Sequence, residues 1–155
     1  MGRAEQIELR RRRGQSEKFE VKNLGTHPVH SRFELKGATG RGYEISLWNV
    51  KDSIHHCTCP DYATNGLGTC KHVEAVLHGL RTDAAEAFAE AERAGGPDGA
   101  LVWLDAGATP RRLRAQVQDD ARPEAQVLLA KLFGKRGLLT PKKLKESFDS
   151  LLTEA

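Results

Sequence analysis

Apolar and polar residues alternate with a period of two in three short stretches of the first part of the chain. These stretches are Ser31 to Leu35, Tyr43 to Trp48 and Ser53 to Cys59. Successive side chains of a strand point to opposite faces, so the alternation predicts strands with one buried face. The glycine-rich residues 37–42 and the polar residues 49–52 are typical of turns. We therefore expect a small antiparallel meander.

After Cys70 the spacing of apolar residues changes to that of a helix. Apolar residues at i, i+3, i+4 and i+7 predict an amphipathic helix from near Lys71 to about Gly79; they are Val73, Val76, Leu77 and Leu80. Thr82 is expected to cap a second helix, Asp83 to Ala94. Its apolar face would carry Ala84, Ala87, Phe88 and Ala91. We interpret this face as core packing, with a partner-binding helix as the alternative.

The residues before the meander have weaker patterns. Ala4 to Arg13 reads as a short helix that ends before Gly14, and Phe19 and Val21 alternate with charged residues as in a short strand. A loop with Pro28 follows and contains His27 and His30. We interpret both histidines as exposed polar residues, with metal ligation as a minor alternative.

The clearest break in the chain is the glycine-rich segment from Gly95 to Gly99. Beyond it we expect a hairpin of strands over 101–104 and 112–117, although a helix over 109–118 is an alternative. A helix from Glu124 to Phe133 and a last helix capped by Thr140 and Pro141 would form a C-terminal helical hairpin. The expected class is α+β, divided into an N-terminal extension (1–30), a central region (31–94) and a C-terminal region (100–155).

All three cysteines of the chain lie close to one histidine in the pattern C-x-C-x10-C-x-H. The four residues are Cys57, Cys59, Cys70 and His72. Residues i and i+2 of a strand share a face, and Pro60, Gly66 and Gly68 permit the chain to turn back. Three thiolates and one imidazole are a common tetrahedral zinc set. We therefore predict one zinc ion that joins the last strand of the meander to the helix after it.

Other interpretations of this cluster are weaker. A disulfide between Cys57 and Cys59 would strain a small ring and leave Cys70 unpaired. His55 has the same strand parity as the first two cysteines and could replace His72; His56 lies on the opposite face. With four protein ligands no position remains for water, so the site should be structural. Its formal charge of minus one suits a helix N-terminus.

The segment Cys57-x-Cys59-Pro60-Asp61-Tyr62, followed by residues 65–77 with Cys70-Lys71-His72, resembles the SWIM zinc finger of bacterial Swi/Snf-type helicase-like ATPases. The resemblance covers roughly residues 31–80. It implies a short β-hairpin followed by a helix, with the same four zinc ligands. It also implies a module that binds DNA or protein, as the N-terminal part or an accessory subunit of a Swi/Snf-type ATPase.

The net charge of +3 is too small to demand nucleic acid as a partner, but the charge is unevenly distributed. Residues 1–56 hold 11 Lys and Arg against 7 Asp and Glu, whereas residues 57–94 hold 3 against 6. Any phosphate contact should therefore come from the flanks of the finger. The candidates are Arg10, Arg11, Arg12, Arg13, Arg32, Lys36, Arg41 and Lys51. The arginine run has a simpler alternative as a solvated, frayed helix end.

Catalysis and membrane insertion have little support in the sequence. Residues 133–136 lack the first glycine and the hydroxyl residue of a phosphate-binding loop. Once the thiols bind zinc, no serine or cysteine nucleophile is paired with a plausible base. No apolar run approaches the length of a membrane span. We expect a cytoplasmic protein, nucleoid-associated if it binds DNA, that is not an enzyme and has no small-molecule substrate. The alternative function is an adaptor in which zinc is purely structural and the helices bind a protein.

Overall fold

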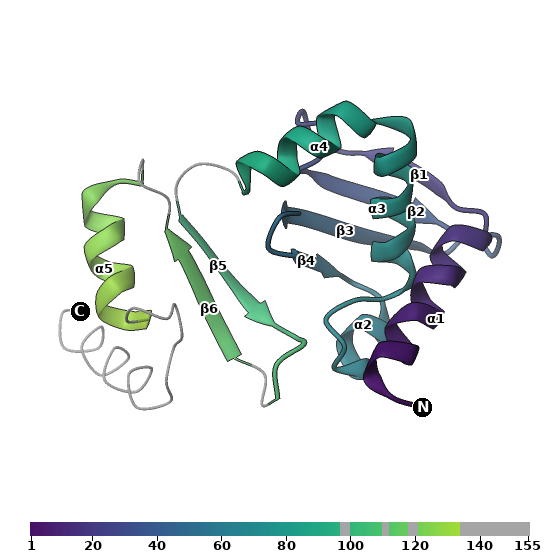
Figure 1. Ribbon diagram of the computed structural model, residues 1–155, viewed down its shortest axis with the longest axis horizontal. Coiled ribbons are helices and arrows are strands. Elements are labelled where there is room, and N and C mark those ends of the chain that lie inside the picture. Colours follow the sequence, from purple (N-terminus) through teal and green to yellow (C-terminus); the bar gives the residue numbers. More distant parts are fainter. Residues whose placement is uncertain (97–99, 110–111, 118–120, 134–155) are drawn as a thin grey trace. The chain divides into compact units, whose positions relative to one another are not determined.

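The computed structural model describes residues 1–96, 100–109, 112–117 and 121–133. It confirms the mixed α+β class (Figure 1). The chain divides into two compact units, Met1–Pro97 and Asp98–Ala155, and each is described by itself. In the described part of the chain, no helix is both long enough and apolar enough to cross a membrane.

The first unit contains an antiparallel sheet of four strands in the order β1-β2-β3-β4. The strands are β1 Glu20–Asn23, β2 Arg32–Lys36, β3 Gly42–Asn49 and β4 Ile54–Cys57. The predicted meander is confirmed as β2 to β4, and β1 joins it by pairing with β2. The segment expected to be an N-terminal extension thus supplies a strand of the sheet.

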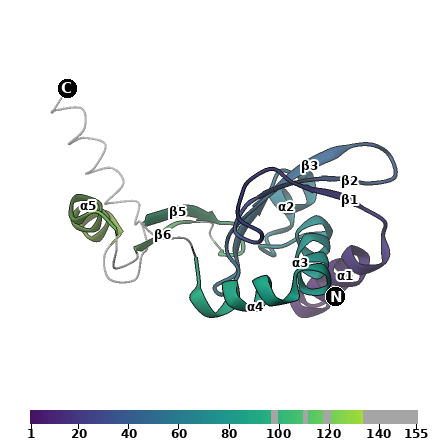
Figure 2. The same cartoon turned by 90° about the horizontal axis from the view of Figure 1, so that it is seen from above.

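The alternation in the sequence gives the sheet one buried and one open face. Phe33 and Leu35 of β2 and Ile45 and Leu47 of β3 are buried. Their neighbours on the opposite face, such as Arg32 beside Ser46, remain partly or fully exposed. Figure 2 shows that the helices α3 and α4 lie on the same side of the sheet, which is therefore the side that carries the core.

Helix α3 spans Lys71–Asp83 and packs its buried residues Val73 and Val76 toward the sheet. It is longer than predicted, because Thr82 lies inside its last turn and donates its hydroxyl to the carbonyls of His78 and Gly79. Thr82 is therefore not the cap of the next helix. That prediction was wrong because a threonine hydroxyl can bond a carbonyl of the preceding turn as well as cap a helix.

Helix α4 spans Ala85–Ala94, with Ala84 as its N-cap residue. Its Phe88 and Ala91 form a buried cluster with Val29 from the loop between β1 and β2, and partly buried apolar residues pack around it. The interpretation of this helix face as core packing is therefore confirmed.

Helix α1 spans Arg3–Ser16 and lies along α3 (Figure 1). The contact is close at Gly14, which is buried. A Cβ atom at this position would lie 2.7 Å from both the backbone nitrogen of Ala75 and the carbonyl oxygen of Lys71. Only glycine fits between the two helices here.

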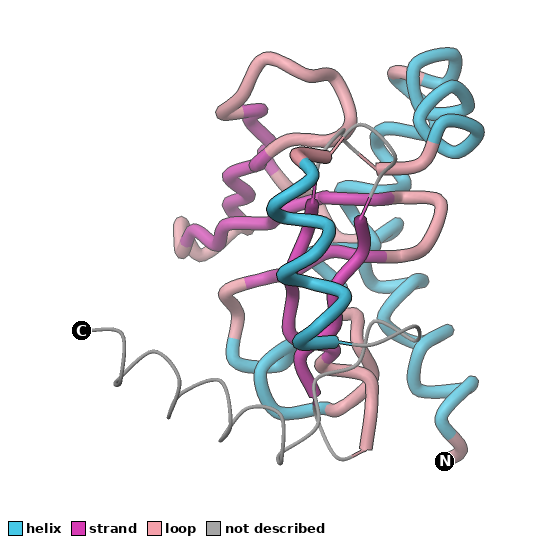
Figure 3. Tube along the Cα trace, turned by 90° about the vertical axis from the view of Figure 1, so that its left-hand side faces the viewer, coloured by secondary structure: helices cyan, strands magenta, loops and turns pink. Residues whose placement is uncertain are grey.

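The second unit contains a hairpin of β5 Ala100–Asp105 and β6 Arg112–Val117, followed by α5 Pro123–Phe133. The strand interpretation of 112–117 is confirmed and the helical alternative is wrong. Helix α5 contacts β6 (Figure 3) and begins at Pro123. The last helix of the predicted C-terminal hairpin lies outside the described residues.

Gly14→Ala should lower the free energy of unfolding of the chain by about 1 to 3 kcal/mol, because the added methyl group must push α1 away from backbone atoms that cannot move aside. Gly79 of α3 is the matched control, since a Cβ atom there meets nothing within 4 Å. Gly79→Ala should be neutral or stabilising by up to about 1 kcal/mol. Urea unfolding of both variants checks this, and equal effects would contradict the close approach.

Candidate metal centre

The four predicted ligands come from two chain segments that the fold brings together. Cys57 ends β4, and Cys59 is the N-cap residue of the short helix α2, Pro60–Asn65. Cys70 is the N-cap residue of α3, and His72 lies in the first turn of α3. The cluster therefore connects the sheet, the α2 loop and the main helix.

The geometry of these residues suits one metal ion. Their ligand atoms all lie within 4.8 Å of one another, and the Sγ atom of Cys70 is 3.9 Å from Nδ1 of His72. Tetrahedral zinc with ordinary Zn–S and Zn–N distances would place such atoms about 3.6 to 3.8 Å apart. The cysteines are at most 1% exposed and His72 is 7% exposed. The structure therefore contains a compact Cys3His cluster that could hold zinc, as in a zinc finger.

His55 does not take the place of His72. It faces the interior, as its strand parity predicts. However, side chains two residues apart on a strand are separated by about 6 to 7 Å, so His55 lies that far along β4 from Cys57. The imidazole of His55 lies beside Tyr62 instead, at 6.3 Å between ring centroids. Its Nδ1 has no hydrogen-bond partner in the described part of the chain. Burial lowers the pKa of His55 to about 4, so the ring is neutral.

Helix α2 was missed in the sequence, where residues 60–68 were expected to form only a turn. The Sγ atom of Cys59 accepts a hydrogen bond from the backbone N–H of Tyr62 at 3.3 Å. Pro60 follows at the first helical position and Gly66 ends the helix with φ of 66°. A cap, a proline and a terminal glycine are the signals that could have found this helix. It fixes the angle at which Cys59 enters the cluster.

Without metal, the three thiols perturb one another strongly. Hydrogen bonds from Cys57 and Cys70 hold the pKa of Cys59 well below its usual value. The hydrogen bond between Cys57 and Cys59 raises the pKa of Cys57 to about 12. The hydrogen bond between Cys70 and Cys57 raises the pKa of Cys70 even more. One thiolate thus forms readily, and the other two thiols must lose protons as a metal binds.

The loop between α2 and α3 is fixed by its own side chains. The Asn65 side chain donates to the carbonyl of Thr69 and accepts from the backbone N–H of Leu67. The buried hydroxyl of Thr69 donates to the Glu74 carboxylate at 2.7 Å. These bonds set the position of Cys70 before α3 begins.

Two arginines of α1, Arg3 and Arg10, bind the segments next to the predicted ligands. Arg3 donates to the carbonyls of Gly66 and Leu67 at 2.8 and 3.0 Å. Arg10 forms a two-point ion pair with Asp61 of α2, at 3.1 and 2.8 Å, and is only 18% exposed. No local sequence signal indicates these contacts, because the partners are more than fifty positions apart.

The other candidate phosphate contacts are dispersed. Arg11 pairs with Glu8 and with Glu74 of α3, and exposed pairs join Arg12 to Glu8 and Arg13 to Glu17. On the sheet, Arg32 and Lys36 lie beside glutamates, at 3.8 Å from Glu44 and 3.3 Å from Glu34. Arg41 lies over the ring of Tyr43, and Lys51 follows β3 in an exposed turn. The eight residues therefore lie on α1, on β2 and in the turns on either side of β3.

Two aromatic rings lie against His72, the histidine of the cluster. The ring of Tyr43 from β3 lies 4.7 Å from the imidazole, and that of Phe19, just before β1, lies 5.6 Å away in an edge contact. These rings shield the imidazole from water and connect the cluster to two strands.

The chain was compared with protein-family models, with curated proteins and with solved structures, and none of them matches it. The assignment of a function therefore rests on the geometry of the cluster and on the residues around it.

His27 and His30, expected to be exposed polar residues, stack on each other at 5.3 Å between ring centroids. His27 is exposed, and its Nδ1 accepts hydrogen bonds from the backbone N–H groups of Val29 and His30. His30 is half-buried, and its Nε2 accepts from the backbone N–H of Val50 at 3.2 Å. Both rings thus act as hydrogen-bond acceptors, outside the metal cluster.

Burial, with the nearby charge of His27, lowers the pKa of His30 below its usual 6.5. The folded chain therefore binds this proton less readily than the unfolded chain. The stability that neutral His30 contributes should be complete above about pH 6.5 and should be lost as the pH falls through the folded pKa. His30→Gln, which keeps an acceptor, should show a smaller loss than the original chain in urea unfolding between pH 7.5 and 5. His78→Asn is the control, and equal pH dependence in all three proteins would contradict this account.

Glu74→Ala should lower the free energy of unfolding by about 1 to 3 kcal/mol, because the buried Thr69 hydroxyl loses its acceptor. Since Thr69 directly precedes Cys70, the affinity for zinc should also fall, as measured by competition with a chromophoric chelator. Glu86→Ala, at an exposed position of α4, is the control for the loss of a helical glutamate. Unchanged zinc affinity in Glu74→Ala would show that the hydrogen bond does not position the ligand.

Proposed function

We propose that this chain is a zinc-stabilised binding module of the SWIM type, in which one zinc ion holds the sheet, α2 and α3 together so that the unit can bind a macromolecular partner. The observation that carries the proposal is the buried cluster of three cysteines and one histidine at the junction of these elements. Residues 31–80 supply the resemblance to SWIM fingers.

The donor set favours a structural ion. Cys57, Cys59, Cys70 and His72 would fill all four positions of tetrahedral zinc, so that no water could be activated there. The proposal therefore assigns no catalysis to the chain. In this role zinc would supply cross-linking free energy to a unit whose own core is small.

Protein interaction is the kind of binding that the contacts of α1 favour. Arg10 has only a small exposed fraction and is held by Asp61, and Arg11 is shared between two glutamates. The positive charges of Arg10 and Arg11 are therefore neutralised by carboxylates of the same unit. A partner such as a Swi/Snf-type ATPase, in the same chain or as another subunit, is the expectation that the SWIM resemblance adds.

DNA binding is the second candidate, and the open face of the sheet is the observation that favours it. Arg32 is 63% exposed in its side chain and lies 3.8 Å from Glu44, and Lys36 is also exposed. Exposed ion pairs of this kind contribute little stability, so both cations could turn to a phosphate. Arg41 and Lys51 are further exposed cations of the same unit.

Purified chain should contain one zinc ion per molecule by elemental analysis, and Cys59→Ser should lose most of it, because three ligands bind zinc far more weakly than four. Removal of zinc with a strong chelator should also lower the unfolding temperature. The control is Thr58→Ser, at an exposed position between the first two ligands. A folded chain without zinc would contradict the proposal, as would a Cys59→Ser variant that retains it.

Duplex and single-stranded DNA binding by the zinc-loaded chain, measured at two salt concentrations, separates the two candidates. Contacts to phosphate release counterions, so the affinity of a DNA-binding module should fall steeply with salt and should fall again in Arg32→Ala. A chain that binds zinc but not DNA would favour the protein-binding module.

A further inference from the structure

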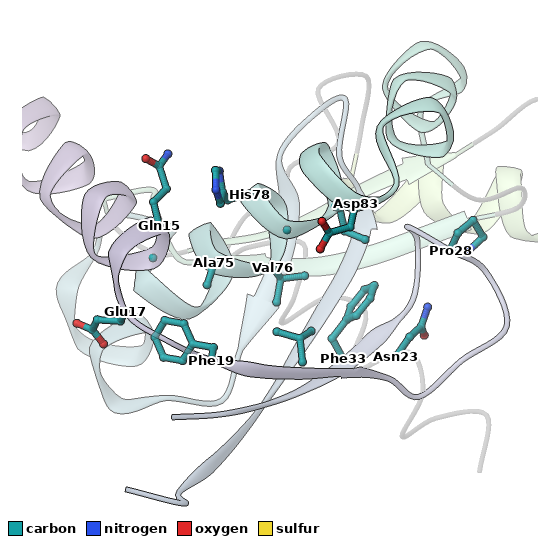
Figure 4. Close-up of a pocket in the computed structure, with 14 residues that line it drawn as sticks. Gln15, Glu17, Phe19, Asn23, Pro28, Phe33, Ala75, Val76, His78 and Asp83 are labelled. Atoms are coloured by element: carbon teal, nitrogen blue, oxygen red, sulfur yellow. The ribbon is translucent and has the colours of Figure 1, made fainter. Parts of the chain in front are cut away.

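A groove of about 480 Å³ runs between α3 and β1 on the core side of the first unit. Figure 4 shows Glu17 and Phe19 at one end of the groove, with Asp83, Asn23 and Pro28 at the other. The groove lies beside the metal centre but contains none of its four ligands.

The walls of the groove combine apolar side chains with polar ones such as Gln15, Asn23 and His78, and they leave room for side chains of a ligand. On the helix side, Ala75 and Gly79 provide small residues, and a Cβ atom at Gly79 would meet nothing within 4 Å. On the strand side, Phe19, Val21 and Phe33 provide apolar surface. The groove can therefore take apolar side chains without any rearrangement of α3.

One wall of the groove is an open edge of the sheet. β1 is the first strand in the order β1-β2-β3-β4, and all four of its residues are exposed, with Val21 45% exposed. The backbone N–H of Leu24 donates to Arg32 of the neighbouring strand at 2.8 Å. Because inward and outward backbone groups alternate in an antiparallel ladder, those of Val21 and Asn23 point away from β2. This edge can accept another strand.

The charges along the groove select the ligand. The carboxylates of Glu17 and Asp83 lie at opposite ends of the groove. Among the described residues that line the groove, none is a lysine or an arginine. Glu17 already pairs with Arg13 and Lys71. The carboxylate of Asp83 accepts a hydrogen bond from the neighbouring Thr82 hydroxyl and forms no ion pair within the described part of the chain. The Asp83 end of the groove would therefore attract a cationic side chain of a peptide and repel a phosphate group.

We propose that this groove binds an extended segment of a partner protein, which pairs with β1 as a fifth strand of the sheet. Alternate apolar side chains of the segment enter the space beside Ala75 and Gly79, and a lysine or arginine reaches Asp83. Backbone pairing supplies affinity, and the groove supplies specificity. The inference rests on the proposed function, because it identifies the protein surface through which the zinc-stabilised unit would bind its partner.

A phage-displayed library of random peptides, selected against the complete zinc-loaded chain, tests this proposal. Selected peptides should alternate apolar residues and carry a lysine or arginine. Synthetic copies should bind Gly79→Leu about tenfold or more weakly, because a leucine at this open helical position fills the groove. They should bind Ala89→Leu unchanged, since Ala89 is an exposed α4 residue outside the groove. Asp83→Asn should weaken binding, and the weakening should shrink at high salt.

Hydrogen exchange of individual amides gives the second measurement. Bound peptide should slow exchange at Val21 and Asn23, whose N–H groups point to the open edge, with little change at Lys22. Peptides with helical spacing, or peptides that bind Gly79→Leu as well as the original chain, would overturn the proposal. Loss of DNA binding in the Gly79→Leu variant would also overturn the groove proposal. If the chain holds one zinc ion but selects no peptide, the groove proposal fails and the zinc module stands; if it holds no zinc, the proposed function fails first.

Discussion

The structure of the first unit depends on bringing four ligand atoms from two separate segments to one point. Cys57 and Cys59 arrive at the end of the sheet, and Cys70 and His72 at the start of α3. The chain between them must reverse, and Gly66 and Gly68, with φ of 66° and 76°, adopt the left-handed conformation that the reversal requires. A metal ion would make this reversal a cross-link, which fixes where α3 begins and hence how it crosses the sheet.

Helix α1 also binds the segments that bring the four ligand atoms together. Arg3 binds carbonyls of the reversing loop, Arg10 binds Asp61 in α2, and Arg11 reaches Glu74, which also accepts from Thr69. The helix can lie this close to α3 because Gly14 has no side chain. The arginine run is thus partly a structural device, even though it reads in the sequence as a basic, solvated helix end.

Sequence reasoning reached the parts of this unit that local patterns determine. Period-two alternation located β2, β3 and β4, the helical period located α3, and the cysteine spacing located the cluster, including His72 in place of His55. It failed where distant residues decide the structure, and where one local signal fits two structures. The pairing of Arg10 with Asp61 has no local signal, and Thr82 satisfies either the end of one helix or the start of the next. The groove was also beyond the sequence, because it depends on how far α3 stands from the edge strand.

The metal centre and the groove share α3, and this connects them physically. His72 binds in the cluster from the first turn of the helix, whereas Ala75 and Gly79 line the groove one and two turns later. Phe19 contacts the His72 imidazole and also lines the groove. If the cluster holds zinc as proposed, its removal would free both the start of α3 and the ring of Phe19, so the helix wall that faces β1 would lose its fixed position. In the proposed module, a structural ion would thus control peptide binding without touching the peptide, because it would set the distance between α3 and the open edge of the sheet.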